Sequence, residues 1–178
     1  MTATTLDDLY NEVAGVPSDI SAHLGILRAL AENVRFVTEF GVRTGVSTRA
    51  LLAGHPTGMM SYDVYPFKDE ERVAEVAKLA GVNWKFVQAD TRKITITPTE
   101  LLFIDTYHTY SQLLIELFMH GPKAWKYIAI HDTDLFGEHG ENGQPGILKA
   151  IQEFLLVYPE WKLFHESKAS CGLQVYAR

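Results

Sequence analysis

The sequence predicts an α/β fold in which helices cover both faces of a doubly wound, mostly parallel sheet. Strand-like and helix-like segments alternate along the 178 residues, which is the pattern of successive strand–helix–strand units. Residues 101–104 are apolar without alternation, as expected for a strand that is covered on both sides. Acidic residues follow several strand-like runs, and in parallel sheets these strand ends share one edge.

The N-terminal segment predicts two helices and the first strand. Thr5 and Asp8 precede an amphipathic run and predict a short capped helix. A second helix is expected over residues 19–31, because leucines recur on one face. The apolar run 34–40 predicts the first strand, and a glycine turn and a helix that ends near Gly54 follow it.

The later elements follow from short apolar runs and from helix signals. Thr109 and Gln112 form a capping-box pattern, which predicts the start of a strongly apolar helix. No helix signal separates the last two strand-like runs, so they are expected to form a hairpin-like antiparallel pair. The expected strands cover residues 59–64, 84–88, 101–105, 127–130, 161–164 and 172–176, and the expected helices cover residues 70–79, 109–121 and 147–158.

One domain is expected over residues 1–178, because a chain of this length with 47% apolar residues can bury one sizeable core. Within it, N-terminal helices over residues 1–33 precede a core over residues 34–178. Four glycines within residues 137–146 predict a mobile loop.

The composition argues against several classes of protein. The net charge is -6 and no cluster of Lys and Arg is present, which argues against nucleic-acid binding. No apolar run approaches the roughly 20 residues of a membrane span, and the N-terminus lacks the features of a signal peptide. The single cysteine, Cys171, excludes an intrachain disulfide. We therefore expect a soluble, cytoplasmic protein that acts on a small molecule and binds neither nucleic acid nor membranes.

Five acids each fall at the end of a predicted strand. They are Glu39, Asp63, Asp90, Asp105 and Asp132. Because ligands of such sheets bind at the carboxyl ends of the strands, these acids are expected to share one rim. Such a rim favours a positively charged or hydroxylated ligand.

The glycine turn after the first strand indicates a nucleotide-like cofactor. Gly41 and Gly45 follow Glu39, and glycine lets a ligand approach the backbone closely. A dinucleotide-binding turn would read G-x-G-x-x-G, which this spacing does not match. Asp63, further along the chain, could hold ribose hydroxyls. The acidity around the turn disfavours a pyrophosphate and favours a cationic cofactor.

Three motifs resemble those of the class I S-adenosylmethionine-dependent methyltransferases. They are E-F-G-V-x-x-G-x-S over residues 39–47, I-D-x-x-H-x-Y over 104–110 and H-D-T over 131–133. The most similar branch is the small O-methyltransferases related to the cephalosporin hydroxylase and rhamnosyl O-methyltransferase group. The resemblance covers most of the chain. It implies a Rossmann-like seven-stranded sheet and methyl transfer from S-adenosylmethionine to a hydroxyl of a small molecule, such as a sugar or a natural product.

The resemblance also implies where the cofactor binds. The first motif would line the methionine moiety, the acid after the second strand would bind the ribose hydroxyls, and the end of the third strand would lie beside adenine. The residues so implied are Glu39, Gly41 and Gly45 for methionine, Asp63 for ribose, and Ala89 with Asp90 for adenine, with Ser47 as a further cofactor-binding residue.

Asp105 and Asp132 end strands that are expected to be neighbours. Two close carboxylates repel each other unless a proton or cation lies between them, and Mg²⁺ would satisfy two such oxygen ligands. In the resembled branch, acids at these strand ends bind a metal that also takes the hydroxyls of the acceptor. This chain has His131 and Tyr107 where that branch often has acids. His131 as a ligand would shift the preference toward Mn²⁺, Fe²⁺ or Zn²⁺.

His108 is the predicted general base, because it follows Asp105 by three residues and histidine titrates near neutral pH. A bond to the backbone at the start of its helix is an equal alternative. The aromatic side chains of Tyr107, Tyr110 and Phe136 could line an acceptor pocket or belong to the core. His139 could cover the substrate or be exposed.

Two other functions stay open at this stage. The first is a catalytically silent protein that uses this fold to bind the cofactor or a partner, which the reduced number of acids supports. The second is a nicotinamide-dependent oxidoreductase, against which the missing G-x-G-x-x-G counts. The small chain leaves little room for a substrate cap, so the lid would come from the glycine-rich loop and N-terminal helices or from another subunit of a homo-oligomer.

Overall fold

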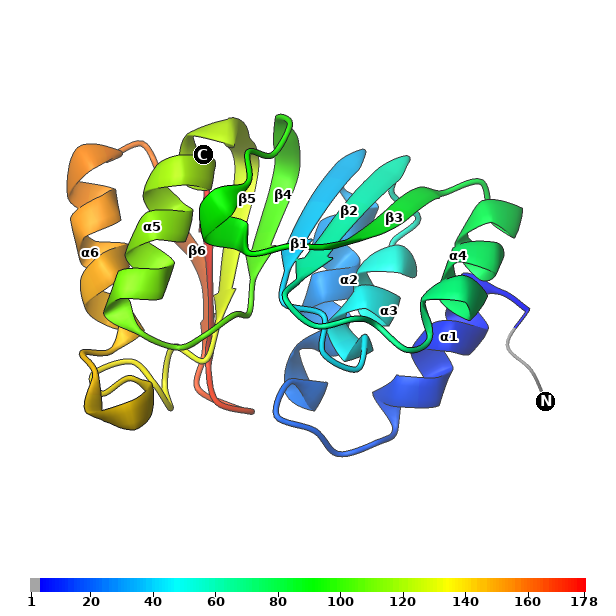
Figure 1. The fold of residues 1–178 in the computed structure, drawn as a ribbon, viewed down its shortest axis with the longest axis horizontal. Coiled ribbons are helices and arrows are strands. Elements are labelled where there is room, and N and C mark those ends of the chain that lie inside the picture. The colour runs from blue at the N-terminus through cyan, green and yellow to red at the C-terminus, as the bar shows by residue number, and fades with distance from the viewer. Residues whose placement is uncertain (1–3) are drawn as a thin grey trace.

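The computed structural model describes residues 4–178, and one seven-stranded sheet forms its centre (Figure 1). The strand order is β3-β2-β1-β4-β5-β7-β6. The strands are β1 (Phe36–Phe40), β2 (Gly58–Asp63), β3 (Asn83–Gln88), β4 (Thr99–Ile104), β5 (Ala124–His131), β6 (Lys162–Ser167) and β7 (Leu173–Ala177). β1 to β5 pair in parallel, whereas β7 is antiparallel to both β5 and β6. The predicted doubly wound sheet with a C-terminal antiparallel pair is therefore confirmed.

Helices cover both faces of this sheet. They are α1 (Leu6–Ala14), α2 (Leu24–Glu32), α3 (Val46–Leu52), α4 (Glu70–Leu79), α5 (Tyr110–His120) and α6 (Ile147–Val157). Successive side chains of the central strand β4 point to opposite faces. Leu101 and Phe103 join the core built by α1 to α4, while Leu102 and Ile104 join the core built by α5 and α6. The uninterrupted apolar run of β4 is thus explained, because its alternate side chains pack into two different cores.

Two predicted helix starts differ from the structure. The segment over 19–31 is divided, because a 3₁₀ turn (Ser21–His23) precedes α2. The N-terminal capping box of Thr5 forms fully. At α5 only half of the predicted box forms: Thr109 accepts a hydrogen bond from the Gln112 backbone at 3.4 Å. The Gln112 side chain bonds Glu116 instead, at 2.7 Å.

The glycine-rich loop over residues 137–146 has internal hydrogen bonds that the glycine count did not predict. His139 and Pro145 form an isolated β-bridge, and the Gly140 amide donates to the Gln144 carbonyl at 2.9 Å. The Glu141 amide donates to the carbonyl of His108 at 3.0 Å. The loop is therefore attached to the segment that leads into α5.

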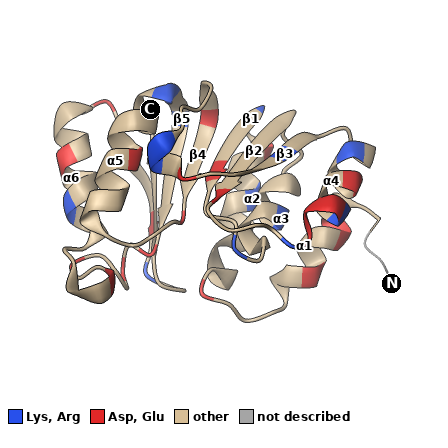
Figure 2. Cartoon of the chain, in the orientation of Figure 1, with Lys and Arg blue, Asp and Glu red and all other residues tan. Residues whose placement is uncertain are grey.

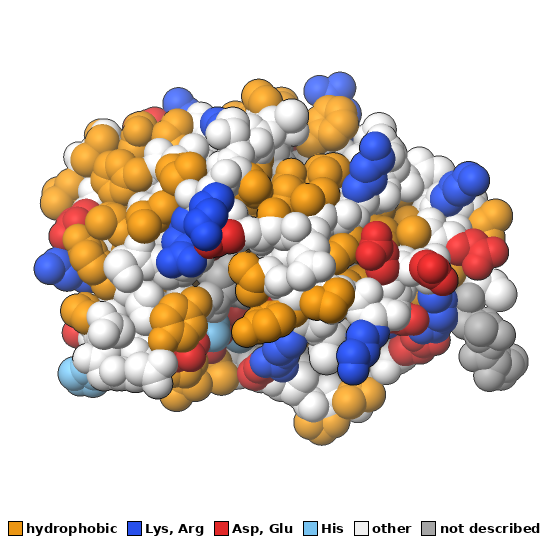
Figure 3. All heavy atoms as spheres, viewed as in Figure 1, with side chains coloured by type: hydrophobic (Ala, Val, Ile, Leu, Met, Phe, Trp, Pro, Cys, Tyr) orange, Lys and Arg blue, Asp and Glu red, His pale blue; other side chains and the backbone are white. Residues whose placement is uncertain are grey.

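The surface carries both signs of charge and some apolar side chains. Both α4 and α6 carry acidic and basic residues (Figure 2). Exposed apolar side chains gather over α5 and α6 (Figure 3), among them Phe118, Met119 and Leu156. No helix within residues 4–178 has the length and apolar character needed to span a bilayer.

Candidate functional site

The glycine turn after β1 is held tightly at the carboxyl edge of the sheet. Gly41 has φ +86°, and a Cβ there would lie 1.7 Å from the carbonyl oxygen of Asp105. Only glycine fits this close crossing with the end of β4. Asp63, at the end of β2, also holds the turn: its Oδ2 accepts hydrogen bonds from the backbone N–H groups of Val42 and Arg43, each at 2.8 Å. The end of β2 therefore fixes the shape of the turn.

A cavity of about 710 Å³ lies against this turn. The chain order reverses between β1 and β4, and ligands of open α/β sheets bind beside such a reversal. Figure 3 looks onto this face and shows it hollowed near its centre. The cavity is lined by Gly41, Arg43, Asp63, Val64, Tyr65, Ala89, Thr91, Arg92, Asp105, Thr106, Tyr107 and Gln112. Three of the residues predicted to bind the cofactor, Gly41, Asp63 and Ala89, are among them.

Glu39 lies beneath the turn rather than in the cavity wall. Its carboxylate is fully buried and accepts hydrogen bonds from the hydroxyls of Ser47 (2.7 Å), Thr48 (2.8 Å) and Ser61 (2.7 Å). Burial raises the pKa of Glu39 to about 7, although these three hydroxyls act in the opposite direction. Ser47 lines a smaller cavity beside the turn. Glu39 thus supports the turn from beneath, and its direct contact with the methionine moiety stays a prediction.

Gly45 and Asp90 also lie outside the lining of the larger cavity. Gly45 has φ +73°, and the space for its Cβ is filled by the ring of Phe67 at 2.6 Å, so packing accounts for this glycine. Asp90 accepts hydrogen bonds from Arg92 Nε (3.0 Å) and Nη2 (2.9 Å), and Lys93 lies 3.3 Å away. The Arg92 side chain holds the pKa of Asp90 well below its usual range.

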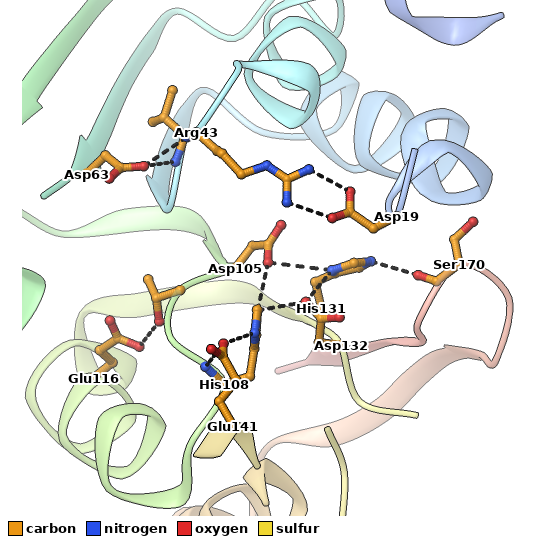
Figure 4. A network of polar contacts seen from close by, with 12 residues as sticks. Asp19, Arg43, Asp63, Asp105, His108, Glu116, His131, Asp132, Glu141 and Ser170 are labelled. Atoms are coloured by element: carbon orange, nitrogen blue, oxygen red, sulfur yellow. Dashed lines mark hydrogen bonds and ion pairs between the residues drawn. The ribbon is translucent and has the colours of Figure 1, made fainter. Parts of the chain in front are cut away.

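An acid–histidine cluster lies at the ends of β4 and β5 (Figure 4). It consists of Asp105, His108, His131, Asp132 and Glu141. His108 Nε2 lies 2.7 Å from Asp132 and 3.4 Å from Asp105. His131 Nδ1 lies 2.9 Å from Asp132 and 3.5 Å from Asp105. The structure therefore brings together the four residues predicted for catalysis and metal binding.

Several segments hold this cluster in place. Asp132 has φ +61° directly after β5, which turns its carboxylate back toward His131. His131 Nε2 bonds the carbonyl of Ser170, in the β6–β7 connection, at 2.9 Å. The ring of Phe136 stacks on His108 at 4.7 Å between centroids. Glu141 of the glycine-rich loop bonds His108 Nδ1 at 2.7 Å. Glu141 was not predicted from the sequence, in which its signal is an acid among loop glycines.

The electrostatics of the cluster favour a positive charge among its carboxylates. A neutral imidazole has one unprotonated ring nitrogen, yet both ring nitrogens of His108 face carboxylates. Burial alone would lower the pKa values of His108 and His131, but Asp105 and Asp132 outweigh it and raise both to about 10. The hydrogen bonds from the histidines hold the pKa values of Asp105 and Asp132 low against the effect of burial.

This protonation places a condition on the predicted role of His108. A protonated imidazole cannot accept a proton, so His108 becomes a base only when a carboxylate contact is released and a proton is lost. Its role as general base stays a prediction with that condition.

The cluster has the donor set of a divalent cation site. Asp105, His131 and Asp132 each offer a ligand atom within 4.8 Å of the other two. The separations of 2.9 and 3.5 Å from His131 Nδ1 to the two carboxylates suit neighbouring ligands that are each about 2.0–2.2 Å from a metal. The residues therefore fit a cation, and an imidazole ligand favours Mn²⁺, Fe²⁺ or Zn²⁺ over Mg²⁺.

An ion pair borders the smaller cavity beside the turn. Arg43, which has φ +49°, bonds Asp19 through Nη1 at 2.7 Å and Nη2 at 3.1 Å (Figure 4). This cavity also borders Asp105 and His108. Arg43 lines both cavities, so the segment before α2 is tied to the turn between them. Neither Asp19 nor Arg43 was predicted from the sequence, because their contact joins distant segments.

Solved methyltransferase structures resemble this fold, although no protein-family model and no curated protein matches the sequence. An O-methyltransferase from Bacillus cereus in complex with SAH has 15% identity and a TM-score of 0.61, with coverage of 100% of this chain and 92% of that chain.

Two further structures agree. The O-methyltransferase TomG from Streptomyces achromogenes, in complex with SAM, has 14% identity, a TM-score of 0.63 and coverage of 95% and 88%. The N-methyltransferase NodS from Bradyrhizobium japonicum has 14% identity, a TM-score of 0.62 and coverage of 90% and 96%. Identities this low establish the fold alone. The strand order, the glycine turn and these likenesses lead to one conclusion: this chain has the fold of the class I S-adenosylmethionine-dependent methyltransferases.

Proposed function

We propose that this protein transfers a methyl group from S-adenosylmethionine to a hydroxyl of a small molecule. The observation that carries the proposal is the cavity of about 710 Å³ at the carboxyl edge, which is bounded by the glycine turn at one end and includes Asp105 of the acid–histidine cluster in its wall. Its volume suits a small-molecule cofactor. Its acidic side chains suit the positive sulfonium of the methyl donor.

Three residues of the lining would hold the cofactor. The missing side chain of Gly41 would let the methionine moiety approach the backbone. Among the described residues, Asp63 Oδ1 bonds only the Tyr65 amide, at 2.9 Å, so it has acceptor capacity left for ribose hydroxyls. Ala89 offers a small apolar surface for adenine. Asp90, paired with Arg92, would contribute to the shape of this end without a direct contact.

The acceptor would lie beside the acid–histidine cluster. A divalent cation held by Asp105, His131 and Asp132 would lower the pKa of an acceptor hydroxyl. Asp105 lines both cavities, so the donor methyl and the acceptor oxygen would meet next to it. His108, after release from Asp132 and loss of its Nε2 proton, would take the acceptor proton at Nε2. The chain contributes mainly the placement of both reactants for an in-line displacement.

A hydroxyl is preferred to an amine as the acceptor because of this cluster. An alcohol must lose its proton to become a good nucleophile, whereas a neutral amine already carries a free lone pair. A group of three acids and two histidines suits the first case. N-methyltransferases have the same fold, so the assay must include both kinds of acceptor.

Methyl transfer from S-adenosylmethionine with a labelled methyl group tests the proposal. Hydroxylated and amine acceptors would be compared with Mg²⁺, Mn²⁺ or a chelator present, and calorimetry would measure the binding of S-adenosylhomocysteine and NADH. Transfer to hydroxyls supports the proposal. Binding of NADH in place of S-adenosylhomocysteine would reject it.

A catalytically silent cofactor-binding protein is the second candidate. One observation favours it: the carboxylates of the cluster are already paired with His108 and His131. Binding of S-adenosylhomocysteine without transfer to any acceptor, at any metal concentration, would select this function.

A further inference from the structure

A buried carboxylate lies behind the wall of the larger cavity, apart from the acid–histidine cluster (Figure 4). Glu116 of α5 is 0% exposed. It accepts hydrogen bonds from Thr91 Oγ1 at 2.5 Å, Thr106 Oγ1 at 2.8 Å and Gln112 Nε2 at 2.7 Å. All three partners line the cavity, whereas Glu116 itself does not. Glu116 can therefore influence a ligand only through these three side chains.

The hydrogen bonds around Glu116 engage the side-chain donors of its partners, because the second Nε2 hydrogen of Gln112 faces Thr91 Oγ1 at 3.4 Å. A threonine hydroxyl has one hydrogen to donate and two lone pairs that accept. Because Thr91 and Thr106 donate to Glu116, only their lone pairs remain for a ligand. Gln112 is fixed in the same way, since a flipped amide would set its oxygen against the carboxylate. Its Oε1 points away from Glu116 and accepts no hydrogen bond from the described residues.

The charged pair at this end of the cavity is partly engaged. Arg92 donates from Nε and Nη2 to Asp90 and keeps its Nη1 donors, so the restriction to acceptors concerns the three side chains around Glu116 and not the guanidinium. Asp90 lies outside the lining, so it offers no acceptor to a ligand in the cavity. The polar side chains of Thr91, Thr106 and Gln112 thus present acceptors only.

We propose that Glu116 is a positioning residue that makes the purine end of the cavity selective for a 6-amino group over a 6-oxo group. The inference depends on the proposed function, because it concerns the adenosyl end of the same cofactor. The amine of adenine donates hydrogen bonds to acceptors. A carbonyl at the same position would set its lone pairs against those of the wall, which costs binding free energy.

Calorimetry with S-adenosylhomocysteine and its 6-oxo analogue, S-inosylhomocysteine, tests this selectivity. The native protein should bind the amino compound at least about tenfold more tightly, as expected when one hydrogen bond is replaced by facing acceptors. In Glu116→Gln, the new amide must donate to a threonine, which then turns its own hydrogen elsewhere. The affinity ratio should fall below about threefold.

Glu100→Gln is the matched control. Glu100 is a buried acid at the opposite end of β4 that accepts backbone bonds from Arg35 and Phe36. Its substitution should leave the affinity ratio at the native value, and a fall equal to that of Glu116→Gln would overturn the inference.

A second variant covers the case in which Glu116→Gln lacks a cooperative thermal transition. Gln112→Met keeps Glu116 and a similar side-chain volume but removes an acceptor. It should therefore weaken the binding of S-adenosylhomocysteine and lower its affinity relative to S-inosylhomocysteine. Equal native affinities for both compounds, or an unchanged ratio in the folded variants, would overturn the inference and leave the proposed function standing. Failure of the native protein to bind S-adenosylhomocysteine would overturn both.

Discussion

Glu39 should make the free energy of unfolding fall as the pH rises from about 4.5 to 7. Burial raises the pKa of this carboxyl from its ordinary value of 4.5 to about 7, so the folded state prefers the protonated form. The stabilisation by the protonated carboxyl is fully present below pH 4.5 and is lost as the pH rises through about 7. A pKa difference of this size corresponds to about 3 kcal/mol.

Urea unfolding of the native protein, Glu39→Gln and Ser47→Ala between pH 4.5 and 8 measures this contribution. Titration of all other groups cancels in the difference between the native protein and Glu39→Gln. That difference should shift by about 3 kcal/mol in favour of Glu39→Gln as the pH rises. Ser47→Ala keeps the carboxylate and removes one of its three hydroxyl bonds, so the pH-dependent loss should persist. A difference that stays flat across this range would refute the reasoning.

Three other substitutions test the site. Asp63→Ala should weaken S-adenosylhomocysteine binding by about 1–3 kcal/mol in calorimetry, because charged hydrogen bonds are lost; unchanged affinity would remove Asp63 from the site. Asp105→Asn should reduce methyl transfer while cofactor affinity stays nearly constant, and parallel loss of both would mark a structural role. Gly41→Ala should lower the free energy of unfolding by about 3 kcal/mol or more, because its Cβ meets backbone. Gly143→Ala, also at positive φ but in open space, should cost about 1 kcal/mol, and equal losses would contradict the packing argument.

Much of the fold could be predicted because its signals are local. The helix over residues 70–79 coincides with α4, since its apolar face and the following Gly81 are adjacent in sequence. The division of the segment over 19–31 has a distant cause. The His23 side chain forms a hydrogen bond with the carbonyl of Ala169 at 2.8 Å, across 146 positions of the chain. No residue close to His23 in the sequence predicts that contact.

The site could be predicted in part, because parallel strands bring their ends to one edge whatever the details of packing. This is why Asp105, His131 and Asp132 meet. The hydrogen-bond partners of each acid could not be predicted, since they come from separate segments. Glu39 is enclosed by hydroxyls from α3 and β2. Glu116 had one usable signal, an acid inside an otherwise apolar helix.

The position of β7 between β5 and β6 has a consequence for how the protein is made on the ribosome. β7 fills an interior place in the sheet although it follows β6 in the sequence, so β6 lacks its β7 partner until synthesis has passed Ala177. The segment between these strands supplies the Ser170 carbonyl that bonds His131. The hydrogen bonds around His131 should therefore be completed later in synthesis than the glycine turn, whose residues are made earlier.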